Sequence, residues 1–146
     1  MRRFCIAILV LAAASLTAGA GDLESIKAQT NLERRSEMAL AFADNALAEA
    51  KAAWRQGETK VFLARLDDVR EAVVLSLDSL QKTGRPPNKL VKWYKSAELK
   101  TRELSRRLES FAEEVSLEDR AAVQKVDERV QAVHEEFLLG ALSRKK

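Results

Sequence analysis

The sequence predicts an all-α protein, an antiparallel bundle of four long helices joined by short connections. Three observations support this fold class. Residues 21–146 are rich in Ala, Leu, Glu, Lys and Arg, which favour helices. No segment alternates β-branched and polar residues in the manner of a half-buried strand. Apolar residues recur instead at spacings of three and four, which places them along one side of a helix, over four stretches of about 25 residues each.

The first two helices are expected over residues 31–56 and 58–82. Thr30 and Glu33 have the spacing of a capping box, with Thr30 as the N-cap residue. Gly57 and Gly84 are placed to end the two helices, because helices often end at a glycine in the left-handed conformation. The buried side of the first helix is expected to be mostly small, with Ala39, Ala43, Ala46, Ala50 and Ala53 beside Phe42, Leu47 and Trp54. The buried side of the second helix is expected to contain Phe62, Leu66, Val69, Val73, Ser76 or Leu77, and Leu80.

The third helix is expected to follow the sequence Pro86-Pro87-Asn88, with Asn88 as its N-cap residue. Ser116 and Asp119 resemble a second capping box, which begins a fourth helix over residues 117–142. Both helices have a continuous apolar seam. The predicted seam of the third helix is Leu90, Tyr94, Ala97, Thr101, Leu104, Leu108, Phe111 and Val115. The predicted seam of the fourth is Val123, Val126, Val130, Val133, Phe137 and Gly140.

Residues 1–20 have the features of a secretory signal peptide. Arg2 and Arg3 precede an apolar run over residues 4–16, and Ala18-Gly19-Ala20 supplies the small residues of a cleavage site. The run is too short for a transmembrane helix, and no second apolar run follows, so no membrane span is expected after cleavage. We therefore expect a protein exported to the periplasm or the extracellular space. Its expected parts are the signal peptide (1–20), a flexible leader (21–30), a four-helix domain (31–142) and a basic tail (143–146).

Two stretches resemble known helical proteins. The junction AAWRQGETKVFLARLDDV (residues 52–69) is similar to the hinge of a tetratricopeptide repeat, with an aromatic residue, Gly57 and then an amphipathic helix. This resemblance implies a short TPR-like array of helical hairpins as the alternative to a bundle. The stretches AELKTRELSRRLESFAEEVSLEDR and VQAVHEEFLLG resemble uncharacterised exported α-helical bacterial proteins. That resemblance implies export but carries no site residues.

The residue content excludes most catalytic and metal centres. His134 is the only histidine, whereas a di-iron bundle needs a Glu-x-x-His motif on each of two helices. A zincin site needs a second histidine four residues after the first. The five glycines of the chain form no glycine-rich loop that could bind phosphate at the start of a helix. We therefore expect a protein that is not an enzyme and that holds no metal.

Met38 and His134 leave one cofactor hypothesis open. Exported four-helix bundles that resemble cytochrome b562 hold haem without a covalent bond, between a methionine on the first helix and a histidine on the last. If the first and last helices are antiparallel neighbours, Met38 and His134 lie roughly 10–12 Å from the same end of the bundle. Haem b is therefore the alternative cofactor. The simpler interpretation is a core methionine and a histidine bonded to a nearby carboxylate.

Charge is distributed unevenly along the third helix. Residues 82–107 contain nine basic and two acidic side chains, whereas residues 108–142 contain three basic and nine acidic ones. This order opposes the helix dipole, which favours acidic residues near the N-terminus and basic residues near the C-terminus. In the simpler interpretation, neighbouring helices offset the lysines with the carboxylates of Glu33, Glu37, Glu135 and Glu136.

The functional alternative is a partner-binding surface on the outward side of the third helix, formed by Lys92, Trp93, Lys95, Leu99, Arg102 and Arg106. Cations around an exposed leucine suit an acidic protein, an anionic lipid surface or another cell-envelope partner. The apolar residues 137–142 are expected to contact a partner, a second subunit of a homo-oligomer, or the leader. Nucleic acid is not expected as a ligand, because no recognition motif is present. The sequence thus predicts an exported, non-enzymatic interaction or structural protein without specifying its ligand.

Overall fold

The computed structural model describes residues 22–143, and this part of the chain is helical, with no strand. Its four long helices are α2 (Leu32–Arg55), α3 (Thr59–Gln81), α4 (Val91–Glu114) and α5 (Leu117–Ala141). A short helix, α1 (Leu23–Lys27), precedes α2, and a 3-10 turn, η1 (Pro87–Lys89), precedes α4. The prediction of an all-α bundle of four long helices is confirmed. None of the helices within the described residues is both long and apolar enough to cross a membrane.

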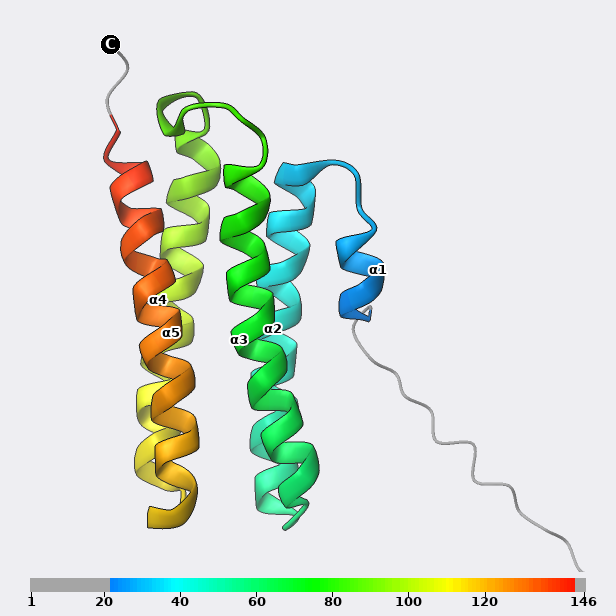
Figure 1. Cartoon of the computed structure of the whole chain (residues 1–146). Coiled ribbons are helices and arrows are strands. Elements are labelled where there is room, and N and C mark those ends of the chain that lie inside the picture. The colour runs from blue at the N-terminus through cyan, green and yellow to red at the C-terminus, as the bar shows by residue number, and fades with distance from the viewer. Residues whose placement is uncertain (1–21, 144–146) are drawn as a thin grey trace, which may run out of the picture.

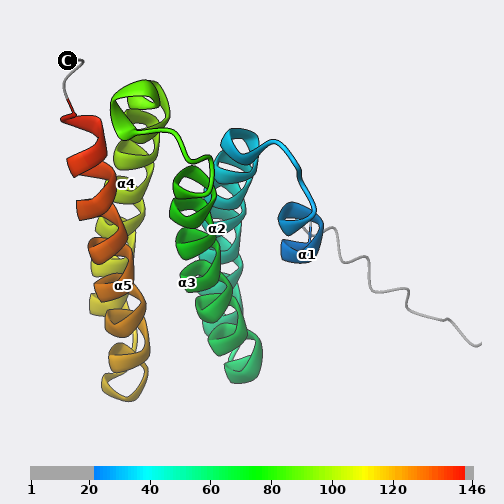
Figure 2. The same ribbon diagram turned by 45° about the horizontal axis from the view of Figure 1, so that its top comes forward.

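The helices form two antiparallel hairpins, α2 with α3 and α4 with α5 (Figure 1). The hairpins lie side by side, so that α2 also contacts α4 and α3 also contacts α5 (Figure 2). The chain crosses one end of the bundle diagonally from α3 to α4, and each of these two inter-hairpin pairs therefore runs in the same direction. As a result, α2 and α5 lie on the other diagonal and do not form a packed pair. The condition on which the haem hypothesis depended, that the first and last helices are neighbours, is not met.

The predicted apolar seams meet in a single core. Every seam residue predicted for α4 and α5 is buried, as are the five alanines predicted for α2. On α3, Ser76 is buried and Leu77 is half-buried, which decides between the two residues proposed for that position. The largest fully buried side chains are those of Phe62, Phe111 and Phe137, on α3, α4 and α5. The core is therefore continuous across both hairpins.

Two of the predicted helix caps are wrong and one is confirmed. Asn31, not Thr30, caps α2, and its side-chain oxygen accepts a hydrogen bond of 2.8 Å from the backbone N–H of Arg34. Asparagine is at least as good an N-cap residue as threonine, so the helix begins one residue later than expected. Asn88 lies within η1, and α4 begins after Leu90 without a side-chain cap. Ser116 caps α5 as predicted.

The expected flexible leader is a helix over part of its length. Asp22 caps α1, and Leu23 and Ile26 are buried where α1 contacts α2 and α3. These two apolar residues, three apart, lie on one side of α1 and are removed from water by the packing. They do not cover residues 137–142 of α5, which was one of the alternatives for that apolar segment. The predicted signal peptide, Gly21 and residues 144–146 lie outside the described residues.

Candidate interaction surface on α4

Five of the six residues predicted to bind a partner lie on the side of α4 that points away from the core. These are Lys92, Lys95, Leu99, Arg102 and Arg106, and all five are exposed. Trp93 is instead half-buried and packs against the core. We call the five exposed residues the outward face of α4. The opposite side of the helix packs against α2 and α5, so the amphipathic pattern of α4 fixes which residues face solvent.

Leu99 lies at the middle of the outward face, and its side chain is 58% exposed. It borders a groove of about 380 Å³ between α2 and α4. The apolar lining of the groove comes from Leu40, Ala41, Leu99 and Leu104, and its polar rim from Asp44, Lys100 and Glu103. An apolar side chain of a partner could therefore contact Leu99 and enter the groove beside it.

The four cations of the outward face differ in their partners. Arg102 pairs with Glu98, and Arg106 pairs with Glu103 at 2.7 Å, both within α4. Lys92 lies over the ring of Trp93, 5.5 Å from its centroid. Within residues 22–143, Lys92 and Lys95 form no ion pair. Of these four cations, the two without an internal ion pair are therefore those at the start of α4.

The expectation that neighbouring helices offset these lysines is wrong. Glu33 pairs instead with Arg85, at 2.9 Å, in the connection before α4. At the other end of the bundle, Arg55 of α2 pairs with Glu114 of α4 at 3.6 Å. Glu33 is therefore already paired with a residue of the α3–α4 connection and forms no ion pair with the lysines of α4.

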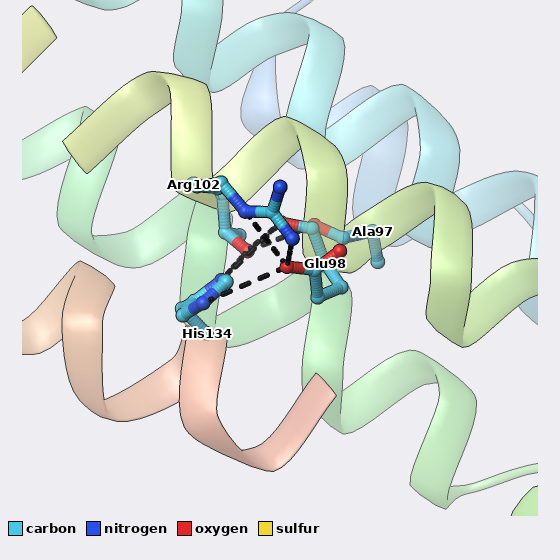
Figure 3. Close-up of polar contacts among 5 residues, drawn as sticks. Ala97, Glu98, Arg102 and His134 are labelled. Atoms are coloured by element: carbon cyan, nitrogen blue, oxygen red, sulfur yellow. Dashed lines mark hydrogen bonds and ion pairs between the residues drawn. The ribbon is translucent and has the colours of Figure 1, made fainter. Parts of the chain in front are cut away.

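Glu98 connects the outward face to α5. Its side chain is only 8% exposed, and Figure 3 shows it between Arg102 and His134. The Nε2 atom of His134 lies 3.7 Å from a carboxylate oxygen of Glu98, and its Nδ1 atom lies 3.1 Å from the hydroxyl oxygen of Thr101. Arg102 is thus paired with a buried carboxylate, although its own side chain is 63% exposed. Sequence reasoning missed Glu98, although the four-residue spacing from Glu98 to Arg102 is typical of a helical ion pair.

Met38 and His134 are not brought together. The sulfur of Met38 accepts a long hydrogen bond of 3.8 Å from the side chain of Gln29, where α1 connects to α2. His134 turns toward α4, and α2 and α5 lie on a diagonal of the bundle. The two residues therefore do not fit as ligands on opposite sides of one haem. His134 matches the simpler interpretation, a histidine beside a carboxylate.

A second buried carboxylate, Asp127, lies on α5 in its contact with α4. It accepts hydrogen bonds from the hydroxyl of Ser105 at 2.6 Å and from the side-chain amide of Gln131 at 2.8 Å. Burial raises the pKa of Asp127 above its ordinary value, and the negative charges of Glu109 and Glu128 raise it further, although the two hydrogen bonds oppose this shift. The folded protein therefore holds the Asp127 proton more tightly than the unfolded chain does.

Replacing Asp127 by asparagine is expected to raise the melting temperature at pH 7 by a few degrees. The raised pKa means that Asp127 favours the folded state in acid, and that this contribution is lost as the pH rises from the ordinary aspartate pKa of about 3.9 through the raised value. The amide removes the buried charge and can still accept the hydrogen bond from Ser105. Thermal melts of both proteins at pH 3 and pH 7 test this. An equal gain at both values would show that ionisation is not the cause.

No group of three or more His, Cys, Asp or Glu side chains within residues 22–143 is arranged to hold a metal ion. Comparison with family models, with curated proteins and with solved structures finds no match to this chain. The outward face of α4 and the groove beside it are therefore interpreted from their own geometry.

Proposed function

We propose that this protein is an exported, non-enzymatic interaction or structural module that contacts its partner through the outward face of α4. The observation that carries this proposal is Leu99, a large apolar side chain that is 58% exposed between basic residues. Interfaces combine buried apolar contacts with a polar rim, and the outward face offers both within a short length of helix.

Electrostatics and shape support the same surface. Lys92 and Lys95 form no ion pair with any of residues 22–143, so their charges can attract an acidic partner and speed its association. The groove between α2 and α4 adds apolar area next to Leu99. The outward face thus combines attraction at a distance with apolar contact at close range.

Export is part of the proposal. Its support is the sequence of residues 1–20, with Arg2 and Arg3, an apolar run, and Ala18-Gly19-Ala20 before the expected cleavage site. A partner would then be met in the periplasm or outside the cell.

A photo-crosslinking amino acid at position 99 tests the surface in the cells that produce the protein. We expect covalent adducts from position 99 and none from position 63, because Leu63 lies on α3 and is 46% exposed but is away from α4. The mass of the uncrosslinked chain shows at the same time whether residues 1–20 have been removed. Adducts at neither position, or equally at both, would argue against the outward face as the contact surface.

Charge reversal provides a matched control for this experiment. Lys92→Glu with Lys95→Glu should reduce the adduct at position 99 at least about fivefold, because two attractive contacts become repulsive. Lys60→Glu with Lys125→Glu makes the same change in net charge at exposed sites on α3 and α5 and should leave the adduct unchanged. Equal losses in both variants would point to net charge rather than to this surface.

A further inference from the structure

Four charges on α4 remain without an explanation from within the bundle. Lys92 and Lys95 lie in the first two turns of the helix, and Glu109 and Glu113 lie in the last two. All four are exposed, and none forms an ion pair with any of residues 22–143. Glu109 only accepts a long hydrogen bond of 3.4 Å from Gln131. The helix dipole favours negative charge near the N-terminus and positive charge near the C-terminus. The two lysines and the two glutamates are therefore at the unfavourable ends of α4.

The same four residues belong to a regular seam on the outside of α4. Spacings of three and four residues connect its exposed members, which are Lys92, Lys95, Leu99, Arg102, Arg106, Glu109 and Glu113. We call this set the outward seam. Alternating spacings of three and four characterise the contact line of a coiled coil, and here they run along the side of α4 that no other helix of residues 22–143 covers.

The order of charges along the outward seam is complementary to that of a second copy that runs in the opposite direction. It begins with two lysines, ends with two glutamates, and has Leu99 and the internally paired Arg102 and Arg106 between them. When two copies of the seam run antiparallel, Lys92 faces Glu113 of the second copy and Lys95 faces Glu109. When they run parallel, each lysine faces a lysine, so the charges select the antiparallel arrangement.

We propose that two copies of this chain pair through the outward seams of their α4 helices, antiparallel and related by a two-fold axis near Arg102. This inference rests on the proposed function, since it names the partner of the same surface. Two-fold pairing is the commonest form of self-association and uses one surface on both copies. Each lysine–glutamate contact therefore occurs twice.

Pairing also resolves the conflict with the helix dipole. In the antiparallel pair, the lysines at the start of one α4 lie beside the C-terminus of the other, where positive charge is favoured. The glutamates at the end of one α4 lie beside the N-terminus of the other, where negative charge is favoured. Every charge that is unfavourably placed in one copy is favourably placed in the pair.

The centre of the seam tolerates close approach. Arg102 lies near the two-fold axis, but the buried carboxylate of Glu98 neutralises its charge in each copy. Leu99 faces Arg106 of the second copy, whose aliphatic stem can pack on it while the guanidinium remains paired with Glu103. The groove between α2 and α4 spans Leu99 to Leu104 and thus lies at the level of this axis. One helix pair buries little area, so we expect a weak dimer that salt dissociates.

Complementary charge reversals test this pairing in purified protein by sedimentation equilibrium at low salt and at concentrations of about 0.1–1 mM, which suit weak complexes. The basic-end variant is Lys92→Glu with Lys95→Glu, and the acidic-end variant is Glu109→Lys with Glu113→Lys. Each variant alone is expected to be monomeric, with the dissociation constant of its homodimer raised at least about tenfold. The reason is that attractive contacts become repulsive on both sides of the two-fold axis. Mixed together, the two variants are expected to form a dimer, and the chain with all four changes is expected to pair with itself.

The outcomes separate this inference from the proposed function. A monomeric wild-type protein, a wild-type dimer that neither variant weakens, or variants that fail to pair when mixed would each overturn antiparallel pairing. Circular dichroism melts establish that each variant is folded. If position 99 crosslinks in cells to a different protein while the purified chain is monomeric, the proposed function stands and the self-pairing falls.

Discussion

Replacing Phe111 by alanine is expected to lower the free energy of unfolding by about 3–5 kcal/mol, as for other fully buried phenylalanines. The ring of Phe111 is fully buried and meets the rings of Trp54 at 5.9 Å and Phe62 at 6.0 Å, both edge to face. These contacts join α4 to α2 and α3, so the ring holds the two hairpins together. Domains are stable by only about 5–15 kcal/mol, and the variant should therefore unfold at a much lower urea concentration.

Two further variants show whether the loss of stability in Phe111→Ala comes from the contacts of the Phe111 ring. Phe111→Leu keeps most of the buried volume and should cost less than half as much as Phe111→Ala. Leu63→Ala removes an exposed side chain from α3 and should change the stability by no more than about 0.5 kcal/mol. Urea unfolding followed by circular dichroism gives all three values. If Phe111→Ala costs no more than Leu63→Ala, the hairpins are not joined through this ring.

The buried side of each helix could be predicted because periodicity and packing depend on the same residues. Along α4, steps of three and four connect the seam residues from Leu90 to Val115, and the side of the helix on which they lie is the buried one. Gly57 and Gly84 have positive φ angles of 71° and 68°, a conformation that glycine adopts without strain, and this made the ends of α2 and α3 predictable.

The order of the helices around the bundle could not be predicted in the same way. A seam shows that a helix has a buried side, but it does not show which helix lies against that side. Residues 82–90 carry the chain diagonally from α3 to α4, and a chain of this length could equally connect adjacent helices. The assignment of Met38 and His134 to one site depended on this order and failed with it.

The outward face was predictable in position but not in detail. Lys92, Lys95 and Leu99 are exposed because they lie opposite the seam of α4. Whether an arginine pairs internally depends on which carboxylates its side chain reaches, and Glu98 lies at the edge of the seam, where the pattern does not distinguish buried from exposed. The structure shows that Arg102 is committed to Glu98, which leaves the unpaired positive charge nearer the start of the helix.

Gly140 is expected to be a position of α5 where even the smallest added side chain destabilises the protein. Replacing it by alanine should lower the free energy of unfolding by about 1–3 kcal/mol through overpacking, although alanine favours a helix by about 1 kcal/mol over glycine. An added Cβ atom would overlap Cδ1 and Cε1 of Tyr94 and lie 2.7 Å from its Cγ. Relieving this overlap would require the Tyr94 ring to shift, and the ring is buried and packs edge to face on Phe137 at 6.0 Å.

A double-mutant cycle with Tyr94 distinguishes this overlap from other effects of the substitution. In a Tyr94→Ala background the ring is absent, and Gly140→Ala should then stabilise the protein by up to about 1 kcal/mol, since only the helix preference remains. The sign of the effect is therefore expected to reverse between the two backgrounds, which urea unfolding of the four proteins measures directly. An equal loss in both backgrounds would mean that Gly140 is required for a reason other than the close approach of Tyr94. A reversal would establish that the absent side chain at position 140 is what allows the start of α4 to pack against the end of α5.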